Sequence, residues 1–96
     1  MLTHIVVWKY RGDVEQTVRE EHVKRLRRLS SVVPGIESFQ VGFDILHLAR
    51  SYDTGLVAIF RDRAALDAYT AHPDHLVVAD FGRGLSHHVV SVDFEG

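Results

Sequence analysis

The stretch YTAHPDHLVVADF, residues 69–81, decides how the second half of this chain folds. Proline has a fixed φ and no backbone N–H, so Pro73 suits the first turn of a helix. The residue before a proline is driven out of the α region. We therefore expect one helix to end near Ala71 and another to begin at Pro73.

The same stretch carries the side chains best suited to chemistry. One tyrosine and two histidines lie within seven residues around the proline. His75 falls in the first turn of the second helix, where the helix dipole disfavours imidazolium and favours neutral imidazole. A neutral imidazole beside the phenol of Tyr69 can act as a general base next to a hydrogen-bond donor. The alternative is a turn with two solvated histidines, and the spacing alone leaves both interpretations open.

Working outward, four segments rich in β-branched and aromatic residues are predicted to be strands. They are His4–Tyr10, Ile36–Asp44, Leu56–Phe60 and Ser86–Phe94. The first helix is predicted from Val14 to about Val32, with Asp13 as its N-cap. Shorter helices are predicted at residues 63–71 and 73–83, the last with Gly84 as its C-cap. Residues 45–52 lack a clean period and are predicted to form a loop over a pocket mouth.

The resulting order, β-α-β-β-α-α-β, predicts an α+β, ferredoxin-like fold with a four-stranded antiparallel sheet backed by helices on one face. We expect residues 1–96 to form a single domain. Several strands are apolar on both faces, although helices cover only one. A bare apolar sheet face is rarely tolerated in a monomer, so we predict a homodimer whose two sheets pack into a barrel.

Composition narrows the classes of partner. The formal net charge is −2, and this gives no basic field for nucleic acid. The basic cluster at residues 24–28 is interpreted as a solvated helix face rather than a phosphate site. There is no cysteine, no signal-like N-terminus and no apolar run long enough for a membrane span. We therefore expect a cytoplasmic protein without metal, cofactor, nucleic acid or membrane partners.

Short motifs along the chain resemble those of a known family. They are HIVVWKY at 4–10, VPGI at 33–36, VG at 41–42, LDAY at 66–69, HPDH at 72–75 and VDF at 92–94. Together they resemble the stress-responsive dimeric α/β-barrel family, often called Dabb, over residues 2–95. The resemblance implies a dimeric ferredoxin-like barrel, and most members of that family have no assigned chemistry.

One plant member, olivetolic acid cyclase, is a polyketide cyclase that closes a poly-β-keto chain by an aldol reaction. Its catalytic tyrosine and histidine match Tyr69 and His75, and a histidine on its first strand matches His4. The resemblance implies that His75 removes a proton between two carbonyls while Tyr69 stabilises the enolate. Leu26 and Thr54 stand where that cyclase has a pocket tyrosine and a histidine, which implies a different substrate.

The predicted site therefore has two catalytic residues, Tyr69 and His75. The predicted ligand contacts come from the first strand and the first helix: His4, Val6, Trp8, His22 and Leu26. Three functions remain open: a module that binds a small apolar ligand, a polyketide-cyclase-like aldol or lyase enzyme acting on a β-keto ligand, and a cofactor-free monooxygenase. The last is an analogy of fold alone. An enclosed apolar cavity touching both catalytic residues would favour the second.

Overall fold

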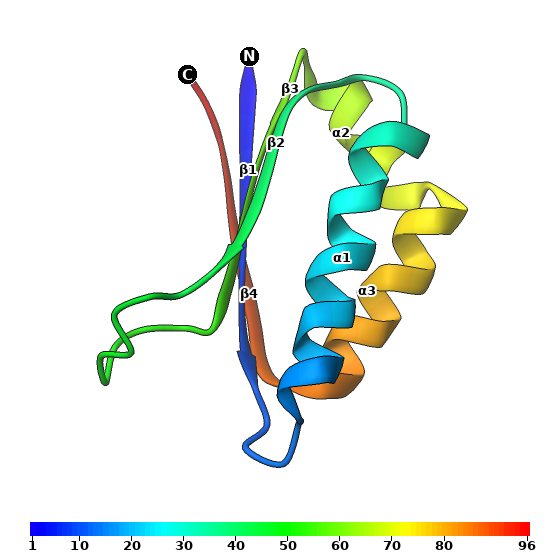
Figure 1. The fold of residues 1–96 in the computed structure, drawn as a ribbon. Helices are drawn as coiled ribbons and strands as arrows, with labels where there is room; N and C mark the ends of the chain where they lie inside the picture. The colour runs from blue at the N-terminus through cyan, green and yellow to red at the C-terminus, as the bar shows by residue number, and fades with distance from the viewer.

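The computed structural model describes residues 1–96, which form four strands and three helices (Figure 1). They are β1 (Leu2–Tyr10), α1 (Gln16–Val32), β2 (Ile36–Phe43), β3 (Thr54–Phe60), α2 (Arg63–Ala71), α3 (Pro73–Leu85) and β4 (Ser86–Glu95). The predicted element order and the ferredoxin-like fold are confirmed. None of the helices combines the length and the apolar character that crossing a membrane requires.

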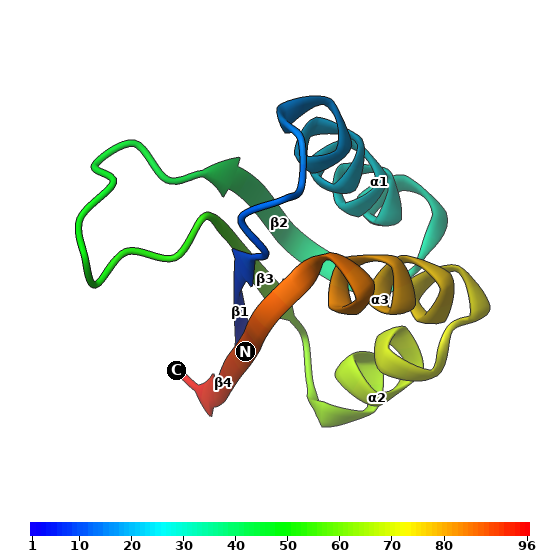
Figure 2. The same ribbon diagram turned by 90° about the horizontal axis from the view of Figure 1, so that it is seen from below.

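The sheet has the strand order β2-β3-β1-β4, and every neighbouring pair is antiparallel. All three helices pack on one face of this sheet, and its other face is bare (Figures 1 and 2). Because β1 lies between β3 and β4, each of its residues from Leu2 to Trp8 has a partner on both sides. His4, for example, lies opposite Ala58 of β3 and Asp93 of β4.

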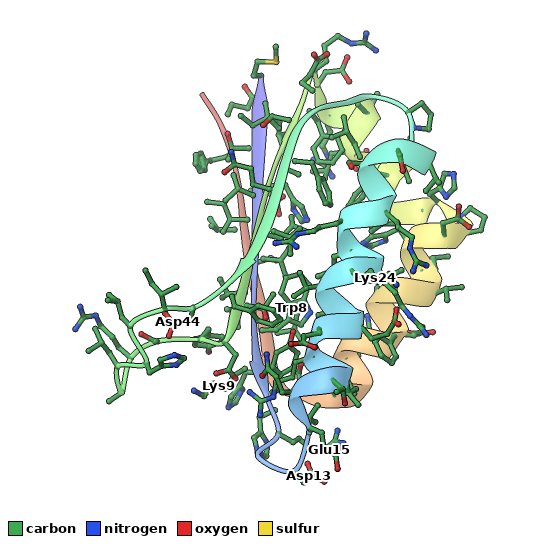
Figure 3. All side chains as sticks on the ribbon, in the orientation of Figure 1. Trp8, Lys9, Asp13, Glu15, Lys24 and Asp44 are labelled. Carbon is green, nitrogen blue, oxygen red and sulfur yellow. The ribbon has the colours of Figure 1, made fainter.

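The core fills the space between the sheet and the helices. Strand alternation sends Trp8 toward α1 and Lys9 toward the opposite face, as Figure 3 shows. From the helix side, α1 buries Leu26 and Leu29 against the sheet. The buried apolar strand residues on this face are Leu2, Trp8, Tyr10, Leu56, Ala58 and Phe60, and Thr54 is buried beside them.

The bare face of the sheet is apolar, as the two-sided strand pattern predicted. Ile5 of β1 lies at its centre, directly opposite Val57 of β3 and Val92 of β4. Val92 is 54% exposed, and the neighbouring β4 residues Val90 and Phe94 are exposed as well. We call the face formed by these residues the open face.

Pro73 separates α2 from α3 as the sequence predicted. His72 has an extended backbone and is both the C-cap of α2 and the N-cap of α3. Its Nδ1 accepts a hydrogen bond from the Asp74 N–H at 3.1 Å. The break leaves the Thr70 carbonyl at the end of α2 without its helical partner, and this carbonyl is used in the site described below.

Two predicted helix caps are wrong. Helix α1 begins at Gln16 with Glu15 as its N-cap, whereas the predicted cap Asp13 pairs with Arg11 at 3.2 Å. Gly84 lies inside α3, whose C-cap is Ser86. The reason is that α3 passes directly into β4, where Ser86 already pairs with Tyr10. A glycine in the left-handed conformation is therefore not needed to end the helix.

Residues 44–53, which we call the arm, join β2 to β3 and extend away from the helices, on the side of the open face (Figures 1 and 2). The Asp44 N–H donates to the Asp53 carbonyl at 2.8 Å, and the Asp53 N–H donates to the Trp8 carbonyl at 2.9 Å. Farther out, the His47 N–H donates to the Asp44 carboxylate at 2.7 Å. The arm is therefore an ordered loop with its own hydrogen bonds.

Gly82 allows α3 to approach the sheet closely. A Cβ built there would lie 2.5 Å from His22 Nε2 and 3.1 Å from Trp8 Nε1, and both rings are buried. We expect Gly82→Ala to reduce the free energy of unfolding by about 1–3 kcal/mol, because rigid buried rings must move. Gly84→Ala is the matched control, since its Cβ would have no neighbour within 4 Å. Urea unfolding of both variants measures this difference, and equal stability would contradict the close packing.

Candidate functional site

A cavity of about 200 Å³ lies between the sheet and α3. Its lining contains both predicted catalytic residues, Tyr69 and His75. It also contains four of the five predicted ligand contacts: His4, Val6, Trp8 and Leu26. The remaining lining residues, which the sequence did not single out, are Leu56, Thr70, Ala79, Arg83, Val89, Val90 and Ser91. The fold thus brings residues from β1, α1, α2 and α3 around one space.

His75 lies in the first turn of α3, and its ring packs against Tyr69 with ring centroids 4.4 Å apart. Its Nδ1 lies 3.0 Å from the Thr70 carbonyl oxygen, which the break before Pro73 left free. A carbonyl can only accept, so Nδ1 carries the hydrogen. In the neutral ring Nε2 then keeps its lone pair, as a general base requires.

The surroundings of His75 keep its ring neutral. Burial lowers the pKa of His75 below its ordinary value, and electrostatic interactions with His4 and Arg83 lower it further. The hydrogen bond to the Thr70 carbonyl acts in the opposite direction without reversing the shift. The imidazole is therefore uncharged at neutral pH and free to accept a proton.

Tyr69 is almost completely buried among aromatic rings. Its ring centroid lies 5.1 Å from that of Phe60 and 6.0 Å from that of His4. Burial raises the pKa of Tyr69, so its hydroxyl stays protonated at neutral pH. Because no protein group hydrogen-bonds this hydroxyl and Tyr69 lines the cavity, it is a donor available to a bound molecule.

Asp93 belongs to this site although the sequence did not reveal it. It lies opposite His4 across the β1–β4 ladder, and its carboxylate bonds His4 Nδ1. An ionised carboxylate only accepts, so His4 Nδ1 carries the hydrogen and its Nε2 is free. The pairing depends on strand register, and register could have suggested it only if the turn geometry were known.

His22 was predicted to contact a ligand, and the structure places it elsewhere. The residue is completely buried behind Trp8, with ring centroids 5.0 Å apart, and it does not line the cavity. Its Nδ1 lies 2.7 Å from the Tyr10 hydroxyl, which in turn lies 2.8 Å from Thr54 Oγ1. The close approach of Gly82 closes the space around His22 Nε2, which has no partner. His22 is thus part of a buried polar network in the core.

The burial of His22 predicts acid sensitivity of the fold. Burial lowers the pKa of His22 from 6.5 to about 4. Between these values the unfolded chain binds a proton that the folded chain does not. Stability from this residue is therefore complete above about pH 6.5 and falls as the pH drops toward 4, by about 3 kcal/mol in total.

Urea unfolding at several pH values measures this loss. His22→Gln should flatten the dependence between pH 7 and pH 4, whatever its stability at neutral pH. His87→Gln, at an exposed position of β4 outside this network, is the control and should keep the wild-type dependence. A wild-type slope in His22→Gln would contradict the assignment.

The cavity has a mainly apolar lining, and the chain holds no cluster of metal-ligating side chains. No group of three or more histidine, aspartate or glutamate side chains converges to hold a metal ion. Five apolar residues also line the cavity: Val6, Trp8, Leu26, Leu56 and Ala79. The arm does not contribute to this lining, so it is not the predicted loop over this pocket. Most of the residues that line the cavity are hydrophobic.

Comparison with protein families identifies the chain. The profile of the stress responsive A/B barrel domain matches residues 2–96. The chain belongs to this family, Dabb. Solved structures agree with a Dabb fold. A dimeric ferredoxin-like protein of unknown function from Thermobifida fusca YX superposes with a TM-score of 0.90 at 24% identity, covering 99% of this chain and 90% of that one.

Two further structures extend the comparison of the Dabb chain. A dimeric ferredoxin-like protein of unknown function from Jannaschia sp. CCS1 is 28% identical, with a TM-score of 0.83 over 99% of this chain and 98% of that one. The hydroxynitrile lyase of Passiflora edulis is 16% identical, with a TM-score of 0.87 over 97% of this chain and 90% of that one. A comparison with curated proteins gives no match.

Proposed function

We propose that this Dabb chain binds a small, largely apolar carbonyl compound and performs acid–base chemistry on it with His75 and Tyr69. The observation that carries the proposal is a single cavity lined by both rings. A neutral imidazole and a protonated phenol are the pair that this chemistry needs. The volume of about 200 Å³ is below the roughly 300–1,000 Å³ of typical ligand pockets, which favours a small substrate.

The reaction that fits this pair is an aldol closure of a β-keto compound, or its reverse. His75 Nε2 removes the acidic proton between two carbonyls, and the electron pair moves into an enolate. The Tyr69 hydroxyl donates a hydrogen bond to the enolate oxygen and stabilises its charge. The enolate carbon then attacks a second carbonyl carbon, and the new alkoxide takes the proton back from the His75 imidazolium.

His4 supports the same chemistry from the other side of Tyr69. The bond from His4 Nδ1 to Asp93 fixes the ring orientation and leaves Nε2 as an acceptor. It can hold a substrate hydroxyl or an enol proton near Tyr69. We assign His4 and Asp93 an orienting role, with Val6, Trp8 and Leu26 as apolar walls.

We also propose that the active form is a homodimer. The open face around Ile5, Val57 and Val92 is a continuous apolar surface without a cover in the single chain. Related structures from Thermobifida fusca and Jannaschia are described as dimeric. A second copy is the simplest cover, because face-to-face packing removes the apolar surfaces of both chains from water.

The arm adds to this interface. Ile45 is 84% exposed and Leu46 is 65% exposed, on a loop that projects on the side of the open face. The hydrogen bonds within the arm order its backbone before any partner arrives, which reduces the entropy cost of association. We propose that each arm packs on the other subunit at the edge of the sheet interface.

An exchange experiment tests the catalytic proposal without knowledge of the natural substrate. A 3-oxo-octanoyl thioester is incubated with the protein in D₂O, and the proton between the carbonyls is followed by NMR. Exchange faster than buffer alone, saturating with substrate, supports proton removal in the cavity. Saturable binding with exchange at the buffer rate would leave a binding module and would exclude the chemistry.

A further inference from the structure

The cavity is elongated, and its two ends differ in character. Along α3 the lining residues are His75, Ala79 and Arg83, which are four residues apart and therefore share one helix face. His75 and Arg83 are separated by about 12 Å along the helix axis, at 1.5 Å per residue. On β1 the lining runs from His4 to Trp8, about 13 Å at roughly 3.3 Å per residue. The similar lengths of the α3 wall and the β1 wall indicate that the cavity is long and narrow.

The inner end of this space carries hydrogen-bonding rings, and the outer end carries the guanidinium of Arg83. His4, Tyr69 and His75 gather at the inner end. The outer end is formed by Trp8, Val89 and the guanidinium-bearing Arg83. No carboxylate is part of the lining. An anion at the outer end therefore meets the Arg83 guanidinium, whereas the lining offers a cation no carboxylate.

We propose, on the basis of the function proposed above, that the ligand is an elongated carbonyl compound that ends in a carboxylate, and that Arg83 selects it. The carboxylate binds the guanidinium at the rim. The apolar chain runs along Val6, Ala79 and Trp8, and the carbonyl reaches Tyr69 and His75. The small side chain of Ala79 leaves room for the chain between the two ends.

Asp80 competes with the ligand carboxylate for Arg83, and this competition can be tested. The Asp80 carboxylate accepts a hydrogen bond from Arg83 Nη1 at 2.6 Å. The side chain of Arg83 is 70% exposed and that of Asp80 is 79% exposed. Ion pairs this exposed are weak, so a ligand carboxylate can displace or share the contact. Removing the Asp80 charge should then strengthen binding of an anion without affecting a neutral ligand of the same length.

Trp8 provides the readout, because it is the single tryptophan of the chain and lines the cavity. Octanoate and 1-octanol are titrated against the intact protein while tryptophan fluorescence is followed. We expect octanoate to bind more tightly, and Arg83→Gln to weaken octanoate about five- to tenfold without changing 1-octanol. Asp80→Asn should tighten octanoate about two- to threefold. Arg83→Lys should keep most of the preference.

Arg28→Gln is the matched control for net charge. It removes the same charge from an exposed position on α1 that is not part of the cavity, and it should leave both affinities unchanged. Equal binding of octanoate by the wild type and Arg83→Gln would overturn the inference. If octanoate failed to inhibit α-proton exchange while the exchange itself was catalysed, the role of Arg83 would be excluded and the proposed acid–base function would remain. If neither ligand bound and no exchange occurred, both would fail.

Discussion

Replacing His75 by alanine is expected to reduce catalysed exchange of the β-keto proton by about 10²–10⁴-fold, the usual contribution of a positioned general base. The reason is specific to this site. The bond from Nδ1 to the Thr70 carbonyl fixes the tautomer, and the lowered pKa of His75 keeps the ring neutral. No other histidine ring packs against Tyr69 as closely, since the centroid of the His4 ring is 6.0 Å from that of Tyr69.

The matched control is His87→Ala, an exposed histidine of β4 outside the cavity, which should retain the wild-type rate. Tyr69→Phe should reduce the rate of catalysed exchange about 10²-fold, because it removes one hydrogen-bond donor to the enolate and keeps the ring.

The pH dependence of the exchange rate gives a second test of the base. Since the His75 pKa is lowered, the acid limb of the rate should lie below pH 6.5. Equal rates in His75→Ala and the wild type would exclude this residue as the base.

The local features of this site were readable from the sequence because they depend on near neighbours. Pro73 dictates where α2 ends and α3 begins, and this places His75 in the first turn beside Tyr69. Strand alternation likewise placed His4, Val6 and Trp8 on one side of β1. These inferences need only backbone sterics and a two-residue period.

Features that depend on long-range register were not readable. The partnership of His4 with Asp93 joins the two ends of the chain and requires the exact pairing of β1 with β4. His22 and Leu26 share a helical stripe, yet only Leu26 reaches the cavity, because Gly82 brings α3 against the His22 ring. A pattern on one helix cannot show where a different helix closes the space.

The second large effect is expected at the open face. Val92→Lys should raise the dissociation constant of the homodimer by more than about 10³-fold, because face-to-face packing would bury an unpaired ammonium. The two-fold symmetry of a dimer introduces the charge twice. In the separate chain Val92 is 54% exposed, so the lysine can reach water there and the fold itself should tolerate it.

Val77→Lys is the matched control, since it makes the same change at a 64% exposed site on α3, on the helix side of the molecule. Sedimentation velocity at micromolar concentrations should show about twice the 10.9 kDa chain mass for the wild type and for Val77→Lys, and the single chain for Val92→Lys. Leu46→Lys in the arm should weaken the dimer less, about tenfold, because only the rim contact is lost.

If the separated chain is unstable, thermal melting followed by circular dichroism replaces sedimentation as the test of the dimer. A dimer-dependent fold has a melting temperature that rises with protein concentration, and Val92→Lys should then melt lower at every concentration while Val77→Lys follows the wild type. The open face and the cavity meet only through β1 and β4, where Val90 belongs to both, so loss of the dimer acts on the site through these strands. A fully dimeric Val92→Lys would mean that another surface joins the subunits and that the open face has a different partner.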